Sequence, residues 1–259
     1  MPTTYELRGD VAVVTIDRPG SFNAIDLETS QSVLTDLDRA GQEARALVLT
    51  GAGRAFSSGV DLAGLKEEYD RGAPDLAATI RDVFNPLIEG LHAAEVPTIA
   101  AVNGAAAGAG MGIALACDLR VVADSAFFMS AFINVAVIPD SGTPWSLPRL
   151  VGLSRAMELA YTGRRVPAEE AVAIGLAHRA ATDEAVVDEA VAWAAELAEG
   201  PTAAYVATRR LLLYGSSHPV GDVLAEEMRV QGEMGLRPEH LEAVDAFLSK
   251  RKPDFKSLG

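Results

Sequence analysis

The sequence predicts an α/β fold, in which strands alternate with helices, followed by a helical tail. Two patterns predict it: short apolar runs rich in β-branched residues, typical of buried strands, and intervening segments with apolar residues at helical spacing. Strands that alternate with helices in this way indicate an α/β core. The predicted strands are residues 11–16, 46–50, 98–102 and 119–122.

Helical spacing marks the segments between and after these strands. Val33, Leu34 and Leu37 indicate one helix, and residues 74–91 contain another. From Ser154 onward strand signals are few, so the pattern predicts an α/β body of about 150 residues before the helical tail. Within the tail, helices are expected over residues 186–197, after Pro201, and over residues 241–248.

Composition and charge narrow the function. The chain has 259 residues, of which 49% are hydrophobic and 22% charged, as in an ordinary packed protein, and we expect one domain. Its net charge of −14 and the absence of a long basic run argue against a nucleic-acid partner. A few local cations and helix N-termini can still hold a small anionic ligand.

Cysteine and histidine usage predicts neither a disulfide nor a metal site. Cys117 is the only cysteine, and the four histidines form no cluster at metal-ligand spacing. The N-terminus lacks the basic start and apolar core of a secretory signal, so we expect a cytoplasmic protein. Residues 98–119 are almost uncharged, but they are mostly Ala and Gly, and we interpret them as a buried strand, a turn and a buried helix rather than a membrane span.

Two glycine-rich stretches are the candidate ligand-binding elements. The first, residues 49–62, follows a predicted strand, and such a turn can leave backbone N–H groups available to an acceptor. The second, residues 101–114, is rich in Gly and Ala, and a helix beginning near Gly108 would direct its first amides at a ligand. Taken singly, the first can serve turn conformation alone and the second close helix packing.

Together the two stretches resemble the paired signature of the enoyl-CoA hydratase/isomerase (crotonase) superfamily, and further motifs continue the match over nearly the whole chain. The resemblance is strongest to the branch of phenylacetate-pathway ring-epoxide isomerases and enoyl-CoA isomerases. The further motifs are Asp17-Arg18-Pro19 with Asn23-Ala24, Ile138-Pro139-Asp140-Ser141-Gly142, Leu147-Pro148-Arg149-Leu150-Val151-Gly152, and residues 246–253.

The resemblance implies a fold, an assembly and a site. The fold would be a ββα spiral core over residues 1–198 with a C-terminal helical trimerisation region over residues 199–259, giving a homotrimer or a dimer of trimers. An acyl-CoA thioester would be the substrate, with no further cofactor, and the backbone amides of Val60 and Ala109 would form an oxyanion hole for its carbonyl oxygen. The implied substrate-binding and coenzyme A-binding residues are Ala24, Ser58, Gly59, Asp61, Leu62, Gly108, Phe132 and Trp145.

The sequence departs from the family pattern at the two glutamates of the hydratases, where it has Gly112 and Phe132. Neither residue can activate water or protonate carbon, so the sequence argues against hydration. Asp140 stands where a branch of the family carries its working aspartate, so the resemblance implies that Asp140 is the base. One carboxylate suffices to move a double bond in an enoyl thioester. Phe127, Phe128, Phe132 and Trp145 could form apolar walls that raise its pKa.

The sequence is compatible with several alternatives. The segment around Asp140 could be only a turn, since Pro, Asp and Gly favour turns, and Asp61 could cap the next helix. Asp140 could also act as a nucleophile in a dehalogenase or hydrolase. A protein that binds acyl-CoA without turning it over is a third hypothesis, because both glutamates are missing.

Overall fold

A six-stranded sheet forms the base of the molecule. The computed structural model describes residues 1–72 and 74–258. The first two strands are antiparallel and all other neighbours are parallel. The strand order is β1 (Thr3–Arg8), β2 (Val11–Ile16), β3 (Ala46–Gly51), β5 (Thr98–Val102), β7 (Leu119–Ala123) and β10 (Arg179–Ala181).

A second, smaller sheet has strands of three residues each. Three of them are parallel neighbours, and the fourth pairs antiparallel with the third. The order is β4 (Ala55–Ser57), β6 (Ala105–Ala107), β8 (Phe127–Met129) and β9 (Arg165–Pro167). Strands this short carry too few residues for an apolar period to stand out, and the sequence pattern did not reveal this sheet.

The chain visits the two sheets in turn. The pairs β3–β4, β5–β6 and β7–β8 each give one strand to each sheet, and a helical segment follows each pair. This repetition is the ββα spiral that the resemblance predicted. Residues 98–119 fold as β5, β6 and α5 (Ala109–Ala116), which confirms the predicted strand, turn and buried helix.

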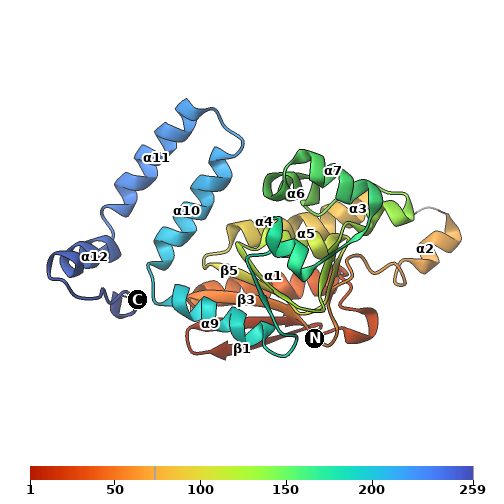
Figure 1. The fold of residues 1–259 in the computed structure, drawn as a ribbon, viewed down its shortest axis with the longest axis horizontal. Coiled ribbons are helices and arrows are strands. Elements are labelled where there is room, and N and C mark those ends of the chain that lie inside the picture. The colour runs from red at the N-terminus through yellow and green to blue at the C-terminus, as the bar shows by residue number, and fades with distance from the viewer. Residues whose placement is uncertain (73, 259) are drawn as a thin grey trace.

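Helices cover the outer faces of the sheets (Figure 1). The helix α1 (Leu27–Glu43) starts at Asp26, whose carboxylate accepts a hydrogen bond from the Thr29 amide, and it packs on β2 and on α4 (Asn85–Ala93). The helix α9 (Val186–Ala198) crosses the six-stranded sheet. The remaining segments are η1 (Pro19–Ser21), α2 (Lys66–Arg71), α3 (Leu76–Thr79), the π-helix η2 (Ile80–Phe84), η3 (Ala131–Val135), α6 (Thr143–Val151), α7 (Leu153–Thr162), α8 (Ala168–Ala173) and η4 (Lys256–Leu258).

The last three long helices extend away from the sheets. Figure 1 shows α10 (Thr202–Gly215) and α11 (Val220–Met234) as a hairpin beside the body, with α12 (Pro238–Leu248) at its foot. The prediction of a body of about 150 residues is wrong, because β9 and β10 lie beyond that point and complete the two sheets. In the described residues, no helix has both the length and the apolar character that a membrane span requires.

Candidate active site

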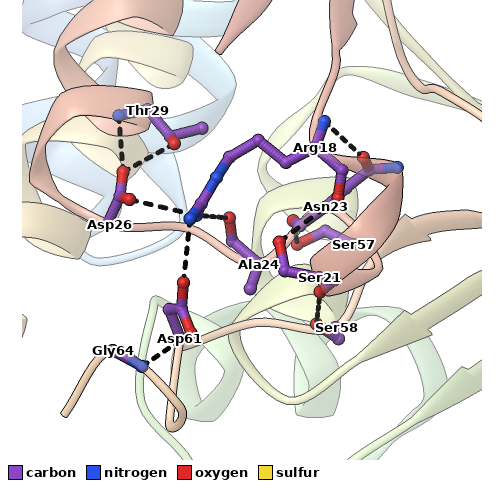
Figure 2. A network of polar contacts seen from close by, with 10 residues as sticks. All are labelled: Arg18, Ser21, Asn23, Ala24, Asp26, Thr29, Ser57, Ser58, Asp61 and Gly64. Atoms are coloured by element: carbon purple, nitrogen blue, oxygen red, sulfur yellow. Dashed lines mark hydrogen bonds and ion pairs between the residues drawn. The ribbon is translucent and has the colours of Figure 1, made fainter.

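A polar network around Asn23 shapes the loop between β2 and α1 (Figure 2). Asn23 is fully buried with φ of 57°, a left-handed conformation that Asn tolerates better than most residues. Its side chain accepts a hydrogen bond from the Arg18 amide and donates to the carbonyl oxygens of Ala52 and Ala55. Asn23 therefore fixes this loop against the first glycine-rich stretch.

The same network brings Ala24 beside the loop of Ser58, Gly59 and Val60. The amide of Ile25 donates to the Gly59 carbonyl oxygen at 2.7 Å, and Ile25 forms an isolated parallel bridge with Val60. The Ser58 amide donates in turn to the Phe22 carbonyl oxygen at 3.0 Å. The structure thus brings Ala24 next to Ser58 and Gly59, which are the predicted coenzyme A-binding residues of the other segment.

Asp61 is tied to this loop by its carboxylate. One oxygen accepts a hydrogen bond from the Gly64 amide at 2.9 Å, which closes the turn that follows. The other pairs with the Arg18 guanidinium at 2.9 Å, and Arg18 also pairs with Asp26 (Figure 2). Asp61 does not cap the next helix, because α2 has Leu65 at its N-cap position and no side-chain cap. Its carboxylate orders the preceding turn instead.

Glycine allows the first stretch to approach the start of α5 closely. A Cβ atom on Gly59 would lie 2.8 Å from the Ala109 nitrogen, and Gly59 has φ of 89°, a value that favours glycine. A Cβ atom on Gly110 would lie 2.2 Å from the Ser57 carbonyl oxygen. Only small residues permit this contact, which places Val60, next to Gly59, near the Ala109 amide.

The amides of Val60 and Ala109 are available to a ligand. Ala109 is the first residue of α5 after Gly108, so its N–H has no partner within the helix. Across residues 1–72 and 74–258, no protein oxygen accepts a hydrogen bond from either amide. Two such donors at a helix N-terminus can stabilise an oxygen that gains negative charge.

Gly112, one turn further along α5, contacts the turn that carries Asp140. A Cβ atom on Gly112 would lie 2.2 Å from the Ser141 carbonyl oxygen and 3.0 Å from Thr143 Oγ1. The Ser141–Thr143 turn therefore fills the space that a glutamate side chain at position 112 would need. Three helical residues span about 4.5 Å, so the turn that follows Asp140 contacts α5 within one helical turn of the Ala109 amide.

The Asp140 carboxyl is half-buried, and burial raises its pKa above the usual value for aspartate. A hydrogen bond from Ser141 Oγ to Asp140 Oδ1, 2.7 Å long, opposes this effect. Within the described part of the chain, no donor reaches Oδ2 of Asp140, so this oxygen is available to a substrate. A carboxylate with a raised pKa, one oxygen held and the other open, is suited to proton transfer.

The other predicted site residues lie at different depths. Phe132, in η3, is buried with 7% of its surface exposed, and Leu62 is exposed beside Asp61. The Trp145 ring lies 5.7 Å from the His92 ring, under the Arg149 guanidinium, and lines a cavity of about 540 Å³ that faces α10. The role of Trp145, Phe127 and Phe128 as walls around Asp140 stays a prediction.

Ser141 and Arg18 were missed as functional candidates. The only local signal for Ser141 was its position directly after Asp140, where a hydroxyl can reach the preceding carboxylate. Arg18 lies in a motif of the family resemblance, but the sequence gave no sign of its role, because its partners Asp26 and Asp61 meet it only in the folded chain. No three His, Cys, Asp or Glu side chains in the part of the chain that the structure describes are arranged to hold a metal.

The site combines two open amides with one carboxylate, and comparison with known proteins decides the family. The family model described as enoyl-CoA hydratase/isomerase matches residues 6–258. The chain belongs to the enoyl-CoA hydratase/isomerase family. It is accordingly an acyl-CoA enzyme with the crotonase fold.

Several relatives of this crotonase-fold chain are similar over nearly their full length. A Rhodobacter capsulatus protein named "Probable enoyl-CoA hydratase" is 43% identical over 97% of this chain and 96% of its own. The 1,2-epoxyphenylacetyl-CoA isomerase of Escherichia coli is 36% identical over 95% and 94%. The crystal structure of an enoyl-CoA hydratase from a Polaromonas species superposes with a TM-score of 0.91 at 31% identity, covering 97% of this chain and 98% of that one.

Proposed function

We propose that this enzyme moves a carbon–carbon double bond of an enoyl-CoA thioester, with Asp140 as the base. The substrate carbonyl oxygen accepts hydrogen bonds from the Val60 and Ala109 amides. The coenzyme A portion lies along Ala24 and the loop of residues 58–62. The enzyme acts on this thioester without a further cofactor.

The contact between Gly112 and the Ser141 carbonyl oxygen carries this proposal. Hydration needs one group to activate water and another to protonate carbon. A glutamate cannot be accommodated at position 112 without moving the turn, and the second glutamate position holds Phe132. Asp140 is the carboxylate that the same turn brings to the end of α5, and one carboxylate suffices for isomerisation.

The proposed reaction has two proton transfers at Asp140. Oδ2 takes a proton from the α-carbon of a β,γ-enoyl thioester, and the electron pair moves into the carbonyl to give an enolate. The two amides stabilise the enolate oxygen, which carries more charge than the oxygen of the bound substrate. Asp140 then returns the proton to the γ-carbon, and an α,β-enoyl thioester forms.

The named relatives support the acyl-CoA class, and one of them supports isomerisation. The Escherichia coli protein is named as an isomerase of 1,2-epoxyphenylacetyl-CoA. The Rhodobacter capsulatus protein is named as a hydratase, an activity for which our chain lacks the two glutamates. We therefore favour isomerase over hydratase activity.

We further propose that the enzyme is a cytoplasmic homotrimer or dimer of trimers assembled through its last three long helices. Large apolar side chains of α11 and α12 are exposed in the single chain, where they would otherwise meet water. A homo-oligomeric interface would bury this surface. The most exposed of them are Val220, Met228, Leu241, Phe247 and Leu248.

A paired assay tests the proposed activity. The purified protein is incubated with 3-enoyl-CoA and, separately, with 2-enoyl-CoA, and products are separated by chromatography. We expect 2-enoyl-CoA from the first substrate and no 3-hydroxyacyl-CoA from the second. Rapid hydration of 2-enoyl-CoA would contradict the proposal, and a covalent adduct on Asp140 found by mass spectrometry would instead show a nucleophile. Tight acyl-CoA binding without turnover would show a binding protein.

A further inference from the structure

Ser141 occupies a backbone conformation that disfavours a side chain. Its φ is 50°, in the left-handed region, which is sterically unfavourable for a residue other than Gly. Its neighbour Gly142 has φ of 71°, so the turn contains two successive left-handed residues. Glycine would remove the strain at position 141, yet the chain has a serine there, and its hydroxyl donates to Asp140.

The hydroxyl is held in place by its surroundings. Ser141 is only 2% exposed, and its carbonyl oxygen packs against the backbone of α5 at Gly112. On the other side of the turn, a Cβ atom on Gly142 would lie 3.1 Å from Cγ2 of Ile88, in α4. The donor is therefore fixed relative to the helix that presents the Ala109 amide.

Few charges lie on the elements that pack around this turn. Neither α5 nor η3 contains a titratable residue. On α4, Glu89 is exposed and His92 faces Trp145, while on α6 the Arg149 guanidinium lies over the Trp145 ring. Burial and the Ser141 hydroxyl are the two influences on the pKa of Asp140.

We propose that Ser141 is a positioning residue for Asp140: its hydroxyl holds Oδ1 and thereby presents Oδ2 as the oxygen that exchanges the substrate proton. The inference rests on the proposed function of Asp140 as base. The hydrogen bond also favours the ionised form of the carboxyl, which is the form that acts as a base. A hydroxyl supplies this hydrogen bond without adding a charge to an apolar site.

Two substitutions distinguish the effect of the Ser141 hydroxyl from the effect of the strained backbone. Ser141→Ala removes the hydroxyl and keeps the strain, whereas Ser141→Gly removes both. Hydrogen bonds to charged groups are strong enough for loss of one to raise the pKa of Asp140 by about one unit. In both variants we expect the rise of kcat with pH to move up by about one pH unit. At pH values below the midpoint of that rise, kcat should be about tenfold lower, with KM little changed.

Controls make the outcome decisive. Ser146→Ala removes another buried serine hydroxyl, on α6, and should leave the pH profile unchanged. The Asp140 carboxyl carbon, observed by NMR in protein labelled with ¹³C-aspartate, reports its pKa whatever reaction the enzyme catalyses. Unchanged titration of Asp140 in both Ser141 variants would overturn the role of Ser141. An inactive wild-type protein with the expected NMR shift would instead contradict the proposed isomerase activity alone.

Discussion

A Cβ atom on Gly112 would lie 2.2 Å from the carbonyl oxygen of Ser141, so α5 and the turn carrying Asp140 are in backbone contact. This contact joins the two halves of the site. It sets the carboxylate against the helix whose first amide is that of Ala109.

Gly112→Ala tests this contact through stability. The added methyl group would meet backbone, which cannot rotate away as a side chain can, so we expect a loss of about 1–3 kcal/mol in the free energy of unfolding. Gly232→Ala is a matched control on α11, where a Cβ atom would have no heavy atom within 4 Å. There alanine should stabilise by up to about 1 kcal/mol. Equal effects in urea unfolding of the two variants would contradict the close contact.

Ala109→Pro tests the oxyanion hole. Proline removes the amide N–H of Ala109, and the first position of a helix tolerates proline well. We expect kcat to fall about 10²- to 10³-fold with the helical circular dichroism signal retained. A variant that folds, binds acyl-CoA and keeps its wild-type kcat would show that this amide does not stabilise the transition state.

Asp140→Asn should stabilise the protein at neutral pH. Burial raises the pKa of Asp140 in the folded state. As pH rises from the ordinary aspartate pKa toward the higher pKa of the folded state, the unfolded chain loses this proton first. Ionisation therefore lowers the free energy of unfolding over that range. Asparagine carries no charge and can still accept the Ser141 hydrogen bond. In urea unfolding, we expect the variant to have a larger free energy of unfolding than wild type near pH 7. This difference should disappear at low pH. A less stable variant at pH 7 would contradict the cost of burying this carboxylate.

Phe247→Glu tests the assembly. Phe247 is 83% exposed in the single chain, on α12, so the substitution should leave the fold intact. If α12 lies in a subunit interface, burying an unpaired carboxylate there is costly, and we expect light scattering to show a shift from trimer toward monomer. Glu196→Gln, on α9, is a control that should leave the mass unchanged. A trimer of undiminished stability in the Phe247 variant would place the interface elsewhere.

Sequence patterns predicted the central strands well, because these are buried on both faces. The predicted strands at residues 11–16 and 98–102 have the same limits as β2 and β5. The sequence pattern did not predict the three-residue strands of the second sheet or β10, and it therefore gave too short a body. Their positions depend on tertiary pairing, such as Phe128 with Val166, which local patterns do not contain.

For the site, the sequence pointed to the candidate residues but not to the contacts between them. The family resemblance pointed to the Val60 and Ala109 amides, and the structure shows both amides available near one another through the Gly59 contact. Local sequence could not show that the Ser141 carbonyl oxygen occupies the space beside Gly112. It also gave no sign that Arg18 pairs with Asp26 and Asp61, since those distances exist only in the folded chain.

The most direct test of Asp140 as the base is proton NMR of 3-enoyl-CoA in deuterated water with wild type, Asp140→Asn and the exposed-site control Asp188→Asn. We predict migration of the double bond to the α,β position with deuterium entering the substrate for wild type and control. In Asp140→Asn both signals should fall at least 10³-fold while acyl-CoA still binds. Migration at the wild-type rate in Asp140→Asn would contradict the account.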